Sequence, residues 1–500
     1  MKYSWFRPPV AVQALLLLVI FFAFMASIQF STPDMPDNDG FYHIKMALLI
    51  REQGLKPPFP YMPLTILNAQ EFYDHHFLFH IALIPFTFGD LRLGAKWAAV
   101  TFASLAFLAV WWLLRGQKVK YSAFWALGLL AVSQAFLYRM SITRPLSLSL
   151  GILVLGLHWM FNGKNRHLAV LAFLYVWMYD AFPLLPALTF LFVVAGFLVE
   201  GRINWKPLVY VLTGTVLGLV INIYFPHDLV FIYRHLLPKL TNPTSASVGN
   251  EWYPYDTAQL LINSPMTLII FLAGILALGL RGKRMDTSLM TAFLATAMFG
   301  FMLFQSRRFI EYFPAFALIF AAMSWSPLFA DPVTGAAEAL PRQLSILFNK
   351  VMPVLLSVIL LFGMYISWRD AVSSIQESLP YTLYSGATKW LMAHTTPGER
   401  IFQTDWDDFP RLFFYDTYNT YMVGLDPTYM QLYDSDLYNQ WVLVTNGKVN
   451  NLSQVIPSEF GAYYVVTDLQ HKDFIAKASM DPGMREVYRD SLSVVYQILK

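Results

Sequence analysis

Cysteine does not occur in the sequence, and ionisable side chains are scarce, because Asp, Glu, Lys and Arg make up only 13% of the 500 residues. Without cysteine the chain can form neither a disulfide framework nor a zinc–thiolate site, and it has no cysteine nucleophile. Soluble globular proteins carry about 25% charged residues, so water is not the main solvent of this chain. The net charge of +3 is too small, and the basic residues are too dispersed, for nucleic acid to be a partner.

Apolar side chains take the place of the missing charges, since 56% of the residues are hydrophobic and 17% are aromatic. Segments suited to crossing a bilayer recur at residues 10–30, 92–114, 121–138, 145–161, 168–180, 182–199, 208–225, 262–280, 287–304, 309–327 and 351–368. No small-residue cleavage site follows the first segment, so we expect a retained span and not a removed signal peptide. The pattern predicts about 11 membrane spans.

The connections between these segments predict the orientation. Every second connection is basic, and the positive-inside rule assigns such connections to the cytoplasm. The basic connections hold Arg115, Lys118 and Lys120; Lys164 and Arg166; Arg202 and Lys206; and Arg281, Lys283 and Arg284. We therefore expect a multi-pass protein of the bacterial inner (plasma) membrane, with its N-terminus in the cytoplasm. The first loop, residues 31–90, and the C-terminal region are then periplasmic or extracellular.

The composition becomes polar and aromatic after the last apolar segment. Short β-like runs lie at residues 399–403, 420–423, 462–466 and 492–498, and a helix-like stretch at 387–394 precedes them. The predicted fold is mainly α. It consists of a transmembrane helical bundle at residues 1–369 followed by a small α/β extracytoplasmic domain at residues 370–500.

Two carboxylates open the first outer loop. Asp37 and Asp39 form a D-x-D pair directly after the first apolar segment. Carboxylate oxygens at this spacing suit Mg²⁺ or Mn²⁺, and such an ion can bind a phosphate leaving group. The alternative is an ordinary solvated loop, which is the commoner state of carboxylates just outside a membrane.

The residues that follow this pair resemble a known motif. The run D-G-F-Y-H-I-K at residues 39–45 begins a stretch that ends at Gly54, and we expect a helix lying along the membrane surface. The run resembles the first-loop motif of GT-C glycosyltransferases, particularly oligosaccharyltransferase catalytic subunits. Asp39, Tyr42 and His43 match that motif directly, whereas Gly40 stands where proline is common. The resemblance implies that Asp39 lies at the metal and acceptor site, with Asp37 as its partner.

Histidines gather later in the same loop, in the run E-F-Y-D-H-H-F-L-F-H at residues 71–80. His76 and His80 are four residues apart and share one face of a helix that Asp74 caps. This spacing predicts a site for a divalent cation or for the phosphate of a lipid carrier, with Asp74 and His75 beside the acceptor. Buried histidines that are only hydrogen-bonded are the equally common alternative.

Four arginines flank the outer ends of later segments. Arg139 and Arg144 lie between the third and fourth segments, and Arg307 and Arg308 begin the tenth beside Glu311. Arginine at a membrane boundary is often an anchor whose charge reaches the interface. The competing interpretation is binding of a lipid phosphate, for which a bidentate guanidinium is well suited.

The C-terminal region carries a partial motif at residues 405–409, D-W-D-D-F. It resembles the W-W-D-Y-G motif with which oligosaccharyltransferases bind their acceptor sequon, but only Trp406 and Asp407 coincide with it. We expect these two residues to contact an acceptor other than a protein sequon. The second acidic motif of the family is also missing, since residues 138–145 contain no carboxylate.

Together these features predict a GT-C-type glycosyltransferase. It would move a sugar or glycan from a polyprenyl-phosphate or polyprenyl-pyrophosphate donor in the membrane to an acceptor glycan, lipid or protein. A lipid or glycan transporter is the alternative from another class, but the chain shows no internal repeat, which many transporters have. An inactive relative that only binds glycan or lipid is the third possibility.

Overall fold

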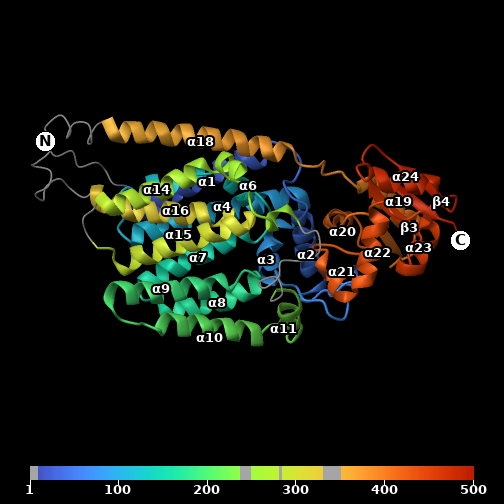
Figure 1. The fold of residues 1–500 in the computed structure, drawn as a ribbon, viewed down its shortest axis with the longest axis horizontal. Coiled ribbons are helices and arrows are strands. Elements are labelled where there is room, and N and C mark those ends of the chain that lie inside the picture. Colours follow the sequence, from blue (N-terminus) through green and yellow to red (C-terminus); the bar gives the residue numbers. More distant parts are fainter. Residues whose placement is uncertain (1–8, 237–248, 281–283, 330–350, 500) are drawn as a thin grey trace, which may run out of the picture.

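The computed structural model describes residues 9–236, 249–280, 284–329 and 351–499. Figure 1 shows two parts along the long axis, a bundle of helices and a smaller unit of helices and strands that holds the C-terminus. We call them the helical bundle, residues 10–376, and the C-terminal unit, residues 385–498. The predicted cytoplasmic residues Arg281 and Lys283 lie outside the described residues.

Most helices of the bundle are continuous apolar segments. They are α1 (Val10–Gln29), α4 (Leu91–Gly116), α7 (Leu146–Phe161), α8 (Asn165–Met178), α9 (Leu184–Glu200), α10 (Lys206–Val220), α15 (Thr287–Gln305), α16 (Phe313–Trp325) and α18 (Met352–Gln376). Two further segments are bent. The segment of α5 (Ser122–Leu127) and η2 (Gly128–Leu130) meets α6 (Gln134–Met140) at 86°, and α13 (Thr257–Asn263) meets α14 (Pro265–Leu280) at 85°.

The number of membrane spans is only partly settled by these helices. Four of them, α1, α4, α15 and the α18 segment, are long and apolar enough to cross a membrane, and six segments are if each bent pair counts as one. Every one of the predicted apolar segments overlaps a helix, but several of these helices have 10–17 residues, so about 11 spans are not confirmed. Proline contributes to the shortening, because Pro145 and Pro183 directly precede α7 and α9, and proline can begin but not continue a helix.

The first outer loop folds into the space between the two parts. It forms α2 (Asp39–Gln53), α3 (Phe77–Leu83) and the short η1 (Ile84–Phe86). Helix α2 ends at Gly54, as predicted, where a positive φ of 97° suits glycine. Residues from Phe41 to Ile50 are mostly buried around the helix, so α2 packs against protein on most of its surface.

The C-terminal unit is built on a five-stranded sheet of order β2-β1-β3-β5-β4. The strands are β1 (Arg400–Gln403), β2 (Thr420–Tyr421), β3 (Tyr464–Asp468), β4 (Met484–Arg489) and β5 (Ser493–Ile498). β1 pairs in parallel with β2 and β3, whereas β5 is antiparallel to β3 and β4. Four strands coincide with the predicted β-like runs. β4 lies outside the predicted runs, and it is an edge strand whose side chains are largely exposed and partly charged.

Helices complete the C-terminal unit around this sheet. They are α19 (Ser385–His394), which coincides with the predicted helix-like stretch, η8 (Trp406–Asp408), α20 (Phe409–Tyr415), α21 (Thr428–Tyr433), α22 (Ser435–Thr445), α23 (Leu452–Val455), η9 (Ile456–Phe460) and α24 (Lys472–Met480). The turn between β1 and α20 therefore carries the predicted acceptor residues.

An aromatic core joins the first outer loop to the C-terminal unit. The ring of Tyr42 in α2 lies 5.7 Å from that of Phe413 in α20, and Phe59 lies 5.8 Å from the same ring. A buried polar contact adds to this docking, because the Nε of Arg411 donates to the Oδ1 of Asn38 over 2.6 Å. The C-terminal unit is thus held against the residues that precede and form α2.

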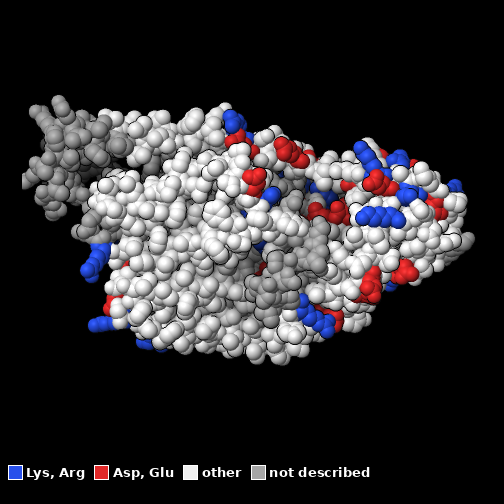
Figure 2. All heavy atoms as spheres, viewed as in Figure 1, with Lys and Arg blue, Asp and Glu red and all other residues white. Residues whose placement is uncertain are grey.

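Charge follows the same division. Figure 2 shows that the helices of the bundle carry almost no charged side chains between their two ends on the face in view. Lys, Arg, Asp and Glu gather over the C-terminal unit and its junction with the bundle. Such a long uncharged band is what a bilayer requires of the side chains that face it.

Candidate functional site

A cavity of about 420 Å³ lies at the junction of the bundle, the first outer loop and the C-terminal unit. Most of the residues singled out in the sequence line it, namely Asp37, Asp39, Tyr42, His43, His75, His76, Arg139, Arg144, Arg308, Trp406 and Asp407. Three do not. Asp74 and His80 are buried behind the cavity, and Arg307 lines a neighbouring cavity of about 460 Å³. Nearly all the predicted site residues therefore lie around one cavity, although they come from different loops.

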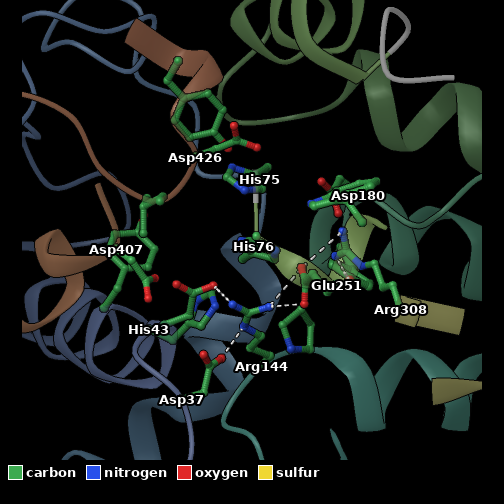
Figure 3. A pocket seen from close by; sticks show the side chains of 18 of the residues that line it. Asp37, His43, His75, His76, Arg144, Asp180, Glu251, Arg308, Asp407 and Asp426 are labelled. Atoms are coloured by element: carbon green, nitrogen blue, oxygen red, sulfur yellow. Dashed lines mark hydrogen bonds and ion pairs between the residues drawn. The ribbon is translucent and has the colours of Figure 1, made fainter. Parts of the chain in front are cut away.

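Arg144 lies among three carboxylates at the centre of this cavity (Figure 3). Its Nε is 2.6 Å from the Oδ2 of Asp37, and its Nη2 is ion-paired with the Oδ2 of Asp39. Its Nη1 donates to Glu251, over 3.3 Å to Oε1 and 3.1 Å to Oε2. Each nitrogen of the guanidinium thus faces a different carboxylate.

A close contact between helix and loop brings Arg144 to the carboxylates. Asp39 is the first residue of α2, and Arg144 belongs to the turn between α6 and α7. A Cβ at Gly40 would lie 3.3 Å from the Cβ of Thr143, so the bare glycine backbone leaves room for the turn. The hydroxyl of Thr143 donates to the carbonyl of Ala95 over 2.9 Å and fixes the turn on α4. Glycine at position 40, where the family commonly has proline, suits this close approach.

Burial and pairing act on the acids of the cavity in different directions. Burial raises the pKa of the Asp39 carboxyl to about 7, although the charge of Arg144 opposes the rise. Burial also raises the pKa of Asp407 well above its ordinary value, and the charges of Asp39 and Asp37 add to this effect. Glu251 behaves oppositely, because Arg139 and Arg144 outweigh its burial and hold its pKa well below the ordinary value. Asp39 is thus an acid of this group that can exchange a proton near neutral pH.

Arg139 is committed to two glutamates. Its Nε donates to the Oε1 of Glu311 over 2.9 Å, and its Nη1 is 2.7 Å from the Oε2 of Glu251. The Glu311 side chain is completely buried. Arg139 therefore acts as the counter-ion of a buried acid, and it is not a membrane anchor.

Arg308 is less committed than Arg139 and Arg144. Its guanidinium lies 4.8 Å above the Trp252 ring, donates to the hydroxyl of Tyr179, and approaches Glu251 only to 3.9 Å. Arg307 points elsewhere and donates to the carbonyl of Pro254 over 3.2 Å. Of the two adjacent arginines, Arg308 is the one that can offer donors to a ligand in the main cavity.

The histidines of the first loop form a hydrogen-bonded chain. The Nδ1 of His80 lies 2.7 Å from the Oδ2 of Asp74, and its Nε2 lies 2.8 Å from the Nδ1 of His43. Both ring nitrogens of His80 are therefore engaged within the protein, one with Asp74 and one with His43.

His75 and His76 line the cavity as neutral rings. Burial lowers the pKa of His76 well below its ordinary value, and the neighbouring His75 and His43 lower it further. The His76 ring is stacked on Tyr179 at 5.5 Å, and His75 is stacked on Phe231 at 5.0 Å. The predicted cap is wrong, because α3 begins at Phe77 with His76 as its N-cap and without a capping side chain. Asp74 instead accepts from the backbone N–H of His76 over 3.0 Å in the turn before the helix.

The side chains predicted to hold a divalent cation do not fit one as arranged. Asp37 and Asp39 share the guanidinium of Arg144, and His80 uses both ring nitrogens within the protein. Over the described ranges, no group of three or more His, Asp or Glu side chains is arranged as the ligands of one ion. The sequence predicted a metal site at Asp37 and Asp39 because it does not show that the fold places the guanidinium of Arg144 between them.

The C-terminal unit closes one side of the cavity with Trp406 and Asp407. The Oδ2 of Asp407 accepts a hydrogen bond from the Nδ2 of Asn38 over 2.7 Å. Asn38 therefore links the acid of the C-terminal unit to the residue directly before Asp39.

Glu251 is the main residue that the sequence reasoning missed. It lies in η4 (Asn250–Trp252), a short turn in the outer loop between α11 (His227–Phe231) and α13, and its backbone carbonyl accepts from the hydroxyl of Ser306 over 2.8 Å. A carboxylate beside three aromatic residues, in the run E-W-Y-P-Y at 251–255, was the available signal. Asp180, in the turn between α8 and α9, also lines the cavity.

The structure is similar to several solved membrane enzymes, whereas no family model and no curated protein sequence matches the chain. The oligosaccharyltransferase of Archaeoglobus fulgidus in the apo form aligns with a TM-score of 0.71 and 15% identity, over 99% of this chain and 75% of that one. ArnT from Cupriavidus metallidurans bound to undecaprenyl phosphate aligns with a TM-score of 0.59 and 17% identity, over 97% of each chain. The arabinofuranosyltransferase AftD from Mycobacteria aligns with a TM-score of 0.60 and 14% identity, over 99% of this chain and 42% of that one. The chain therefore has the fold of the GT-C glycosyltransferases, as the motif at residues 39–45 predicted.

Proposed function

We propose that the protein is a multi-pass membrane glycosyltransferase. It moves a sugar or glycan from a polyprenyl-phosphate or polyprenyl-pyrophosphate donor to an acceptor on the non-cytoplasmic face of the membrane. The observation that carries this proposal is that two groups line the same cavity. Asp39 is a carboxylate with a near-neutral pKa, and Arg308 is a guanidinium that approaches its nearest carboxylate only to 3.9 Å.

These two groups suit the two ends of a transfer reaction. An acceptor hydroxyl attacks the anomeric carbon of the sugar, the bond from that carbon to the phosphate oxygen breaks, and the lipid phosphate leaves with the electron pair. Asp39 takes the proton of the hydroxyl as general base, a role that a pKa near the working pH favours. Arg308 and Arg144 stabilise the charge that develops on the leaving phosphate.

The fold relatives support a lipid-linked donor. ArnT was solved with undecaprenyl phosphate, and the archaeal oligosaccharyltransferase AglB was solved with dolichol-phosphate and an inhibitory peptide. A lipid phosphate presents its charge at the membrane boundary, and the cavity of this chain lies at the end of the uncharged band of helices (Figure 2). Membrane lipid is then both the solvent of the bundle and the carrier of the substrate.

The acceptor would bind on the side of the cavity formed by α2 and the C-terminal unit. Tyr42, His43 and His75 of the first outer loop line the cavity, as do Trp406 and Asp407 of the C-terminal unit. Asp74 would act indirectly, because it contacts His80 and not the cavity. Apart from its tryptophan and the aspartate after it, residues 405–409 lack the W-W-D-Y-G motif, which favours a glycan or lipid acceptor over a protein sequon.

The topology belongs to the same proposal. We propose about 11 passes, made by the four long helices, the two bent pairs and the shorter helices α7, α8, α9, α10 and α16. Residues 1–369 then form the transmembrane domain and residues 370–500 the extracytoplasmic domain, with the N-terminus in the cytoplasm of a bacterium. Reporter fusions after residues 40 and 450 test this arrangement, since both must lie outside for the site to assemble.

A transfer assay tests the reaction. Purified protein in lipid nanodiscs is incubated with radiolabelled polyprenyl-phosphate and polyprenyl-pyrophosphate sugars and with candidate glycan and lipid acceptors. Asp39→Asn is expected to lower kcat by roughly 10²–10⁴-fold. The matched control is Asp473→Asn, an exposed acid of the C-terminal unit, which should leave the rate unchanged.

Three results would contradict the proposal. Movement of the donor lipid across a liposome membrane without sugar transfer would make the protein a transporter. Binding of glycan or lipid with no turnover of any donor would make it an inactive relative. Transfer by Asp39→Asn at the wild-type rate would remove Asp39 from the reaction.

A further inference from the structure

We infer that the guanidinium of Arg144 takes the place of a divalent cation in this site, so that the carboxylates Asp37 and Asp39 hold an arginine and bind no metal ion. The inference rests on the proposed function for its consequence, which is sugar transfer without added metal. It concerns the chain's own residues, however, and ion binding tests it separately from activity.

The guanidinium of Arg144 lies where a D-x-D pair would hold a divalent cation. A divalent cation held by a D-x-D pair lies between the two carboxylates and within about 2.0–2.6 Å of their oxygens. That position is occupied by the Nε and Nη2 of Arg144, which face Asp37 and Asp39. The planar fork of the guanidinium matches this arrangement, because its nitrogens can reach separate carboxylates at once.

The permanent charge of Arg144 also opposes binding of a metal ion at these carboxylates. Arg144 stays protonated at every accessible pH, and Asp37 and Asp39 hold its pKa above the ordinary value although burial opposes them. Only 15% of its side chain is exposed, so solvent screens it weakly. A metal dication at the same carboxylates would meet a fixed positive charge at contact distance.

The position of Arg144 in the sequence supports the same inference. Residues 138–145 contain no carboxylate, although the resembled family carries its second acidic motif there, and they place Arg139 and Arg144 in the cavity instead. In this chain, the segment where the resembled family has acidic residues supplies positive charge to the cavity. Glu251, from a distant loop, balances this charge.

The other acids of the cavity do not offer a second set of ligands. Asp407 accepts from Asn38, and the Oδ1 of Asp426 accepts from the hydroxyl of Thr428 over 2.6 Å. Asp180 lies near Arg308, on the side of Arg144 that is away from Asp37 (Figure 3). The charge beside the leaving phosphate is then supplied by the guanidinium groups of Arg144 and Arg308.

Binding of Mn²⁺ tests the inference without reference to activity. The probe is Mn²⁺ alone, titrated into purified full-length protein and followed by electron paramagnetic resonance of the free ion. The wild type is expected to bind no stoichiometric Mn²⁺. Arg144→Ala releases Asp37 and Asp39 and is expected to gain one site, which Arg144→Ala with Asp37→Asn loses again.

Arg139→Ala is the matched control, because Arg139 pairs with Glu251 and Glu311 but not with Asp37. It removes the same charge from the same cavity and is expected to create no Mn²⁺ site. If Arg144→Ala does not fold, Arg144→Gln keeps the volume of the side chain and replaces it. The wild-type measurement decides the inference even if neither variant folds.

The outcomes separate this inference from the proposed function. Stoichiometric Mn²⁺ binding by the wild type that Asp37→Asn abolishes would overturn the inference, whatever the activity. Where transfer is measured, wild-type turnover should be unchanged by EDTA, and a loss that Mn²⁺ restores would overturn it as well. Absence of transfer with every donor, together with no Mn²⁺ site, would remove the proposed function and leave the role of Arg144 standing.

Discussion

Two walls of the same cavity handle buried ionisable groups in opposite ways. One wall, which we call the arginine wall, consists of Arg139, Arg144 and Arg308 with their counter-ion Glu251. The other, the imidazole wall, consists of three histidines of the first loop, His43, His75 and His76, and His80 is hydrogen-bonded to His43 behind them. Both are removed from solvent, yet only the first keeps its charge.

The difference arises from the partners that each wall has. Every guanidinium of the arginine wall has a carboxylate within reach, which repays the cost of burying the charge. On the imidazole wall, burial and the positive charge of Arg144 lower the pKa of His43 well below its ordinary value. The cavity is thus divided between permanent cations, which suit a phosphate, and neutral hydrogen-bonding rings, which suit a sugar or its acceptor.

Removal of the shared carboxylate is expected to have the largest effect. Glu251→Ala leaves Arg139 and Arg144 together without their common counter-ion, and breaking a buried ion pair costs about 3–5 kcal/mol of unfolding free energy. Denaturation of purified protein in detergent measures this loss. Glu459→Ala, at an exposed position of the C-terminal unit, should change it by less than about 0.5 kcal/mol. Equal stability of the two variants would show that the arginine wall does not depend on Glu251.

Interruption of the imidazole wall should cost less. His80→Ala removes the partner of Asp74, and an unsatisfied buried group costs about 1–3 kcal/mol, more when it is charged. The same denaturation experiment applies, with the exposed His167→Ala as the control. A loss as large as that of Glu251→Ala would contradict the distinction between a charged and a neutral wall.

The pH dependence of transfer distinguishes the base from its neighbours. Burial raises the pKa of Asp39 to about 7, and only the deprotonated carboxylate accepts a proton from the acceptor. The rate should therefore be full above this pKa and fall about tenfold per pH unit below it. Arg144 opposes the rise, so Arg144→Gln should move the acidic limb to higher pH. A rate independent of pH from 5 to 8 would argue against Asp39 as the base.

The smallest effect is expected where the C-terminal unit meets the cavity. Asn38→Ala removes the hydrogen bonds to Asp407 and Arg411, each worth about 0.5–1.5 kcal/mol, or more where the partner is charged. Because these bonds position the acceptor side, KM for the acceptor should rise while the KM for the donor stays constant. Asn162→Ala, in a cytoplasmic connection of the proposed topology, is the control. A change confined to the donor KM would place the two substrates the other way round.

Local patterns were sufficient for much of the fold. Each apolar segment overlaps a helix, Gly54 ends α2, and β1, β2, β3 and β5 lie on the expected runs. These features depend on neighbours within a few residues, which the sequence displays directly. The span count and β4 were harder, because helix length depends on breaks such as Pro183, and an exposed edge strand carries no apolar alternation.

The candidate site shows the same limit more sharply. The sequence identified Asp37 and Asp39 by their D-x-D spacing and their motif, and Arg144 by its position at the outer end of an apolar segment. It left open whether Arg144 anchors the membrane or binds phosphate, and it did not anticipate the pairing with Asp37 and Asp39. It also did not single out Glu251, because nothing near residue 251 shows that three arginines converge on it.

By itself the sequence determined the chemistry that is available: apolar helices, a basic alternation of connections, no cysteine, and a short supply of ionisable groups placed between the segments. Only the tertiary structure decided which of those groups meet. Partners such as Asp39 and Arg144 are separated by about a hundred positions and belong to different loops. Electrostatic pairing acts over a few ångströms of space and not along the chain, so packing alone set their contacts.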